Sequence, residues 1–148
     1  MATHTIDIIL VEDNPDDADL AIRALKKNGP ASSIVHLQDG EEALDFIFCK
    51  GTYADQVFGE MPKLILLDLK MPKVDGIEVL RQVKSDARTK AIPVVLLTSS
   101  NEDRDIAASY QFGANSYIVK PVDFESFVKA VSNIGLYWLL LNQIPHLQ

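Results

Sequence analysis

Residues 64–72 read LILLDLKMP, a continuous apolar run that ends in an acid, a lysine and a proline. A run of this kind, without alternating polar residues, is typical of a parallel strand covered on both faces. Four other short apolar runs are predicted to be strands, at residues 6–11, 34–37, 93–97 and 117–119. Segments with helical spacing separate all five, as parallel strands require. The sequence therefore predicts an α/β fold: a doubly wound five-stranded parallel sheet in the flavodoxin-like order 2-1-3-4-5, with helices on both faces.

Residues with capping chemistry mark where the predicted helices begin and end. The first helix is expected to begin at Asn14-Pro15 and to end near Asn28-Gly29-Pro30, because Asn caps, Pro fits the first helical position and Gly favours the end. The others are expected at about 41–49, after Asp75-Gly76, from a capping box at Ser100–Asp103 to before Gly113, and from near Asp123. The long connection Lys50–Pro62 is predicted to be a surface loop.

The composition excludes several classes of protein. The 148 residues are 47% hydrophobic and 24% charged with a net charge of −7, which indicates a globular acidic protein that repels nucleic acid and anionic lipid. Cys49 is the single cysteine, so no internal disulfide forms and a reducing compartment is favoured. No apolar run approaches the roughly 20 residues of a membrane span. We expect one cytoplasmic domain over 1–148, whose last helix is extended from about residue 135, with neither nucleic acid nor membrane as partner.

Chemically active side chains follow the predicted strands. Glu12 and Asp13 follow the first strand and Asp68 follows the third, and these strands are neighbours in the predicted order, so the three carboxylates should meet. They repel one another unless a cation joins them, and an all-oxygen set favours a hard cation such as Mg²⁺. Thr98 and Lys120 follow the fourth and fifth strands and should flank the same point. This arrangement suits a phosphoryl group, for which a carboxylate can be the acceptor.

Four motifs occur in order within about residues 6–135: Leu10–Asn14 (LVEDN), Leu66–Pro72 (LLDLKMP), Thr98, and Tyr117–Pro121 (YIVKP). Together they resemble the receiver domain of two-component response regulators. The resemblance implies that Asp68 is the phosphoacceptor and that a histidine kinase is the donor. It also implies a switch protein that catalyses only its own phosphotransfer and dephosphorylation, and not an enzyme with other substrates.

The same resemblance implies roles for the residues around Asp68. Asp13 would bind Mg²⁺ directly and Glu12 directly or through water, with Asp68 and the backbone carbonyl of Lys70 as further ligands. Many family members carry Asn at the position of Lys70, so a cationic side chain at the mouth of the site is a departure. The lysine would leave metal binding through its backbone carbonyl intact but change how water and the phosphodonor approach the site.

The motifs that follow imply the rest of the machinery. Thr98 would bind a phosphoryl oxygen and Lys120 would form an ion pair with it, across a cis Lys120-Pro121 bond. Tyr117 would be the aromatic residue whose rotamer follows Thr98, so that these two residues form the switch. We interpret Asp17, in contrast, as a helix-capping acid.

The long loop at Lys50–Pro62, the stretch Asn115-Ser116-Tyr117 and the ending with Tyr137-Trp138 and Ile144-Pro145 resemble the stand-alone regulators paired with bacterial and cyanobacterial phytochromes. This resemblance implies a phytochrome-type kinase, a downstream protein partner whose identity the sequence does not give, and signalling by protein–protein contact. The consecutive apolar residues 137–141 cannot all face one core. A homodimer is therefore expected, with Tyr137, Trp138 and Leu141 in its interface.

Three other kinds of protein share some of these features with a receiver. A pseudo-receiver that is never phosphorylated would normally lack Asp13, Asp68 or Lys120, and all three are present. A flavodoxin-type flavin carrier needs a phosphate-binding loop after the first strand, but Glu12–Asp17 is acidic there. An aspartyl-phosphate phosphatase of the Asp-x-Asp type would need an acid at position 70, which is lysine.

Overall fold

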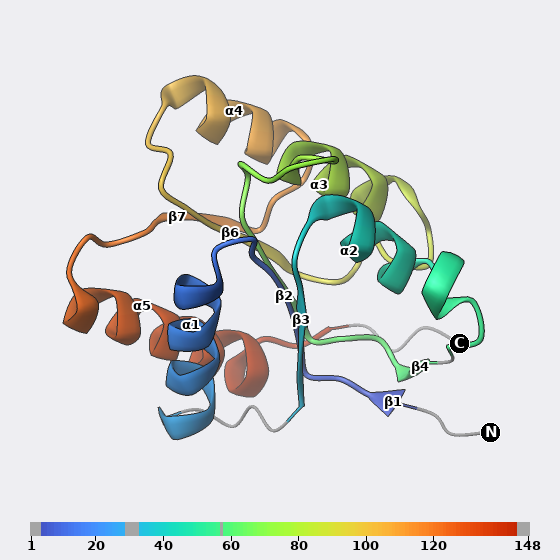
Figure 1. Cartoon of the computed structure of the whole chain (residues 1–148), viewed down its shortest axis with the longest axis horizontal. Helices are drawn as coiled ribbons and strands as arrows, with labels where there is room; N and C mark the ends of the chain where they lie inside the picture. The colour runs from blue at the N-terminus through green and yellow to red at the C-terminus, as the bar shows by residue number, and fades with distance from the viewer. Residues whose placement is uncertain (1–3, 29–32, 57, 145–148) are drawn as a thin grey trace.

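The computed structural model describes residues 4–28, 33–56 and 58–144. Its main sheet has five parallel strands in the order β3-β2-β5-β6-β7 (Figure 1). The strands are β2 (Ile8–Val11), β3 (Ile34–Leu37), β5 (Leu64–Leu67), β6 (Val94–Thr98) and β7 (Ser116–Val119). This confirms the doubly wound parallel sheet and the order 2-1-3-4-5 of the five predicted strands.

Helices cover both faces of the sheet, as predicted. α1 (Pro15–Asn28) and α5 (Phe124–Leu136) lie side by side on one face, and α2 (Gly40–Ile47), α3 (Gly76–Ser85) and α4 (Asp103–Gln111) lie on the other (Figure 1). The strands divide their side chains between two cores because successive residues point to opposite faces. In β2, Ile8 and Leu10 belong to the core under α1 and α5, whereas Ile9 and Val11 belong to the core under α2 and α3.

Most of the predicted helix starts are confirmed. The side chain of Asn14 accepts hydrogen bonds from the backbone amides of Asp16 (2.9 Å) and Asp17 (3.1 Å), and Asp75 and Asp123 cap α3 and α5. The capping box expected at Ser100 is wrong. The hydroxyl of Ser100 donates to Asp105 (2.5 Å) and its oxygen accepts from the amide of Glu102 (3.4 Å), but α4 begins only after Glu102. The predicted end of the first helix at Gly29-Pro30 lies outside the described residues.

The connection Lys50–Pro62 contains more structure than the predicted loop. It holds a short 3₁₀ turn, η1 (Gly51–Tyr53), and β4 (Phe58–Glu60), which pairs in parallel with β1 (His4–Thr5) in a separate two-stranded sheet. At the other end of the chain, α5 continues into the π-helical turn η2 (Tyr137–Leu141). Within the described residues, no helix has both the length and the apolar character needed to cross a bilayer.

Candidate functional site

Three carboxylates meet at the carboxyl edge of the sheet. Glu12 follows β2 and Asp68 follows β5, and the neighbouring strands pair Val11 with Leu67, which puts the two acids next to each other. Asp13 is the third member, and one oxygen from each of the three acids lies within 4.8 Å of the others. Glu12 and Asp68 are buried, whereas Asp13 is exposed. The predicted convergence of these side chains is confirmed.

The backbone around Glu12 and Asp68 is tightly held. The Glu12 carboxylate accepts from the amide of Asn14 (3.2 Å), and the Glu12 carbonyl accepts from Nε2 of His36 on β3 (2.8 Å). The Oδ1 atom of Asp68 accepts from the amide of Leu69 (2.7 Å). His36 received no role from the sequence, yet it fixes the chain at the start of the acidic group. These bonds orient the carboxylates before any ligand arrives.

The electrostatics of the acidic group favour a cation. The pKa of Glu12 is raised to about 7, mainly by burial and also by the nearby charge of Asp68, against the lowering effect of a hydrogen bond from Lys120. Carboxylates whose ionisation is resisted gain most from a positive partner. The three acids offer only oxygen ligands, at spacings that one ion can bridge, so they fit a hard divalent cation.

Lys120 brings an ammonium to the same point. Its side chain is only 11% exposed, and its Nζ lies 2.7 Å from Glu12, 2.9 Å from Asp17 and 3.5 Å from Asp68. Burial alone would lower the pKa of Lys120, but its hydrogen bonds to Glu12 and Asp17 and the charge of Asp68 raise the pKa above its ordinary value. Lys120 therefore stays charged and forms a charge-assisted hydrogen bond with Glu12, a member of the acidic group.

Asp17 is the site residue that the sequence interpretation missed. Its amide is capped by Asn14 as expected, but its carboxylate also binds Lys120, which is 103 residues away in sequence. A usable signal was present: Asp17 lies in the first turn of α1, and helical side chains point back toward the N-terminus of their helix. There they approach the carboxyl end of β2.

Thr98 and Tyr117 are linked through Ser100. Thr98 is completely buried at the end of β6, and its hydroxyl accepts a weak hydrogen bond from the amide of Ser100 (3.4 Å). The half-buried Tyr117 donates from its hydroxyl to the carbonyl of Ser100 (2.9 Å), and burial raises its pKa. The expected cis bond at Lys120-Pro121 is wrong, since no cis peptide occurs among the described residues and trans is the lower-energy isomer.

The side chain of Lys70 extends toward α4. Its Nζ lies 3.5 Å from Oδ2 of Asp105, the same oxygen that accepts from the hydroxyl of Ser100. The hydrogen bond from Ser100, together with the charge of Lys70, lowers the pKa of Asp105. Lys70 itself remains exposed, as expected for a cation at the mouth of the site.

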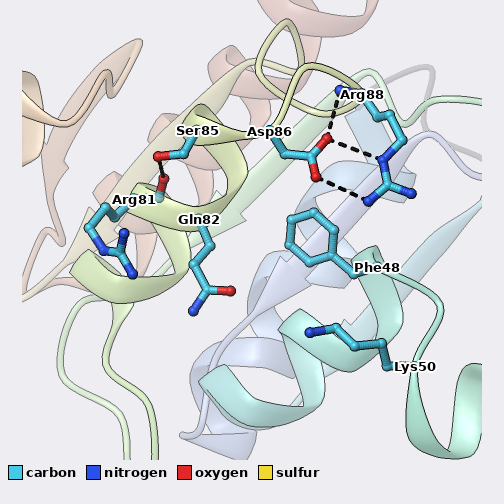
Figure 2. Close-up of a pocket in the computed structure, with 7 residues that line it drawn as sticks. All are labelled: Phe48, Lys50, Arg81, Gln82, Ser85, Asp86 and Arg88. Carbon is cyan, nitrogen blue, oxygen red and sulfur yellow. Dashed lines mark hydrogen bonds and ion pairs between the residues drawn. The ribbon is translucent and has the colours of Figure 1, made fainter.

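A depression lies at the carboxyl ends of α2 and α3 (Figure 2). It has a volume of about 420 Å³ and is lined by Phe48, Lys50, Arg81, Gln82, Ser85, Asp86 and Arg88. Its two arginines are already paired, Arg81 with Glu78 and Arg88 with Asp86. The depression therefore has little unpaired positive charge for an anion, and the carboxylate edge remains the better candidate.

The residues predicted to form an interface do not share one environment. Tyr137 and Leu141 are exposed, at 49% and 70%, whereas Trp138 is half-buried and packs against the core under α1 and α5. The rings of Tyr137 and Trp138 meet edge to face, with centroids 4.9 Å apart. Tyr137 and Leu141 are thus free to contact another molecule, and Trp138 mainly completes its own core.

Known proteins match both the sequence and the fold. Residues 8–132 match the family model described as response regulator receiver domain. The probable methanogenesis regulatory protein FilR2 of Methanothrix harundinacea is 43% identical over 138 residues, which are 93% of this chain and 86% of that protein. Response regulator Rcp1 of Synechocystis sp. is 38% identical over 138 residues, 93% of this chain and 92% of that protein.

Two crystal structures are similar over nearly their whole length. The Mn²⁺-bound form of Rcp1 has a TM-score of 0.87 and 37% identity, and the match covers 95% of this chain and 99% of that one. The phosphorylated cyanobacterial phytochrome response regulator RcpA also has a TM-score of 0.87, with 39% identity and coverage of 97% and 99%. Fold, acidic edge and similarity agree, and the chain belongs to the response regulator receiver domain family.

Proposed function

We propose that this receiver accepts a phosphoryl group on Asp68 from a phosphohistidine of a histidine kinase. The observation that carries the proposal is the position of Lys120, whose ammonium, on a side chain only 11% exposed, lies 3.5 Å from the buried Asp68. A cation beside a carboxylate in a water-poor site stabilises added negative charge, and a phosphoryl group brings such charge. Thr98 ends the neighbouring strand β6, and its hydroxyl can donate a hydrogen bond to a phosphoryl oxygen.

The transfer itself needs few groups from the protein. A carboxylate oxygen of Asp68 attacks phosphorus, the P–N bond breaks, and the imidazole nitrogen keeps the electron pair and takes up a proton. Lys120 compensates charge on the transferring oxygens, and Thr98 donates a hydrogen bond to one of them. Lys70 limits the approach of water at the mouth. The protein acts on its own phosphoryl group only and is a switch rather than an enzyme for other substrates.

We propose Mg²⁺ as the physiological cation. Glu12, Asp13, Asp68 and the backbone carbonyl of Lys70 would hold it, which is an oxygen-only set of the kind Mg²⁺ prefers. When bound, the cation would neutralise charge on the phosphoryl oxygens. The Mn²⁺-bound form of the similar Rcp1 supports a divalent ion, since Mn²⁺ also prefers oxygen ligands.

A phytochrome-type photoreceptor is the proposed kinase. The support is the similarity to RcpA, described as a phytochrome response regulator, over nearly the whole of both chains. The similarity to FilR2, described as a probable methanogenesis regulatory protein, supports the competing assignment, in which the kinase is not a phytochrome. We further propose a single cytoplasmic domain over 1–148, extended from about residue 135, that signals to a downstream protein as a homodimer and contacts neither nucleic acid nor membrane.

Two measurements test these proposals separately. Acetyl phosphate with Mg²⁺ should add one phosphoryl mass to the protein, Asp68→Asn should abolish the addition, and Asp13→Asn should raise the Mg²⁺ concentration needed for it. Uptake by Asp68→Asn at the parental level would overturn the phosphoacceptor. Phosphotransfer from a panel of histidine kinases then tests the donor, and a faster transfer from non-phytochrome kinases than from phytochrome kinases would refute that assignment.

A further inference from the structure

We infer that Asp17 is a positioning residue that holds Lys120 in a resting pose and competes with the phosphoryl group for it. The inference rests on the proposed phosphorylation of Asp68 and adds a control on how readily the phosphorylated state forms. It starts from the ion pair of 2.9 Å between the Asp17 carboxylate and Nζ of Lys120.

The three acids around Lys120 are not equivalent. Glu12 and Asp68 also belong to the carboxylate group that suits a cation, so other demands act on their oxygens. Asp17 lies outside that group, on α1, and is one-third exposed. Its carboxylate is therefore a partner that Lys120 keeps in the resting protein whatever happens at the acidic group.

The distances indicate which partners Lys120 prefers in this state. Those to Glu12 (2.7 Å) and Asp17 (2.9 Å) are the lengths of charge-assisted hydrogen bonds, whereas the 3.5 Å to Asp68 is longer than such a bond. Lys120 is thus held by Glu12 and Asp17 together and makes no bond of that length to the phosphoacceptor. An ion pair between Lys120 and a phosphoryl group on Asp68 therefore has to form in competition with these two hydrogen bonds.

The charge of Asp17 acts in the same direction. The Asp17 carboxylate is separated from Asp68 only by the ammonium of Lys120. It repels an incoming phosphoryl group and also neutralises the Lys120 charge that would attract that group. Both effects disfavour the phosphorylated state, and both vanish when the carboxylate becomes an amide. Only a ligand with different affinities for two states shifts their balance, and the phosphoryl group is such a ligand here because it must win Lys120 from Asp17.

A neighbouring residue provides a matched control. Asp16 precedes Asp17 in the first turn of α1, carries the same charge and favours the same helix end. Its side chain is exposed, and within the described residues no ion pair is found for it. Asp16→Asn therefore reproduces the loss of charge and of helix-dipole interaction without touching Lys120.

The test measures binding of beryllofluoride, a phosphoryl mimic, to the full chain in saturating Mg²⁺. Asp17→Asn should bind it about fivefold more tightly than Asp16→Asn, the effect expected for loss of one partly exposed ion pair. Asp17→Glu should restore affinity close to that of the parent. Affinity for Mg²⁺ alone should be the same in Asp17→Asn and Asp16→Asn, because Asp17 is outside the acidic group. A purely structural role would change melting temperature without this selective change in affinity.

The outcomes separate the two proposals. If the parent protein does not bind beryllofluoride, or binds it equally well after Asp68→Asn, the proposed function fails and this inference fails with it. If the parent binds through Asp68 but Asp17→Asn equals Asp16→Asn, or binds more weakly, only the role of Asp17 is overturned.

Discussion

The ammonium of Lys70 lies 3.5 Å from the carboxylate of Asp105, so the loop after β5 is tied to the first turn of α4 across the mouth of the site. Asp105 also accepts from Ser100, two residues after Thr98. A phosphoryl group on Asp68 would offer Lys70 a second anion. Phosphorylation of Asp68 would thereby be connected to the position of α4 through Lys70.

Lys70→Asn should shorten the life of the aspartyl phosphate. The lysine adds positive charge and bulk where water enters, and the amide keeps neither, so decay should accelerate by a few-fold, roughly the strength of one exposed ion pair. Loss of phosphoryl mass after removal of the donor measures the rate. Lys73→Asn is the control, since Lys73 is an exposed cation of the same loop that pairs with Asp39 and not with Asp105. Equal decay in the two variants would refute the role of Lys70.

Tyr117→Phe should uncouple phosphorylation from the surface of α4 and β7. It removes the donor to the Ser100 carbonyl but leaves the ring in the core, at a cost of about 1 kcal/mol in stability. Phosphorylation should persist, while amide chemical-shift changes in α4 on adding acetyl phosphate should diminish. Tyr110→Phe, on the exposed side of α4, should leave those shift changes at the parental size. Full-sized changes in Tyr117→Phe would contradict the switch.

Gly76→Ala should damage the site through the backbone. A Cβ at Gly76 would lie 2.2 Å from the carbonyl oxygen of Asp68, which no side-chain rotation can relieve. The loop must move, so we expect slower phosphoryl uptake and a loss of about 1–3 kcal/mol in the free energy of unfolding. Gly135→Ala would meet only the flexible end of Leu25, at 2.9 Å, and should phosphorylate normally. Normal uptake by Gly76→Ala would show that the loop is more adaptable than this contact implies.

Leu141→Ser should weaken the proposed homodimer without unfolding the protein. Leu141 and Tyr137 are exposed beyond the core of α5, so polar replacements there remove apolar area that is available to a second molecule. Sedimentation at micromolar concentration should show a dimer for the parent and a monomer for Leu141→Ser. Trp138→Ala is expected to lower the melting temperature instead, because Trp138 packs on its own core. A parent protein that stays monomeric at every concentration would refute the dimer.

The sheet and the acidic group could be predicted because both depend on short, local signals. Val94–Thr98 and Leu64–Leu67 are entirely buried, and continuous apolar runs of this kind identify parallel strands. Once the order of strands is known, residues that end neighbouring strands must meet. Glu12, Asp13 and Asp68 followed from that rule alone.

The features that were missed depend on contacts with distant partners. Asp17 has the ordinary appearance of an acid in a first helical turn, and only Lys120, far along the chain, gives it another partner. β1 and β4 are two and three residues long, too short for any periodicity to indicate a strand. At Ser100 a local pattern failed because α4 begins only after Glu102, so the amide that reaches the Ser100 oxygen (3.4 Å) is that of Glu102 and not one within the helix.

The small sheet of β1 and β4 marks an end of the molecule whose sequence and loop lengths are less constrained than those of the end that carries the candidate site. Both of its strands precede the amino ends of β2 and β5, whereas the three carboxylates, Thr98 and Lys120 lie at or just beyond the carboxyl ends of strands. We therefore expect changes in length near residues 50–56 to leave the phosphoryl chemistry untouched. We expect that region to accept a fluorescent reporter or an affinity tag with less effect on the switch than any insertion near the carboxylates.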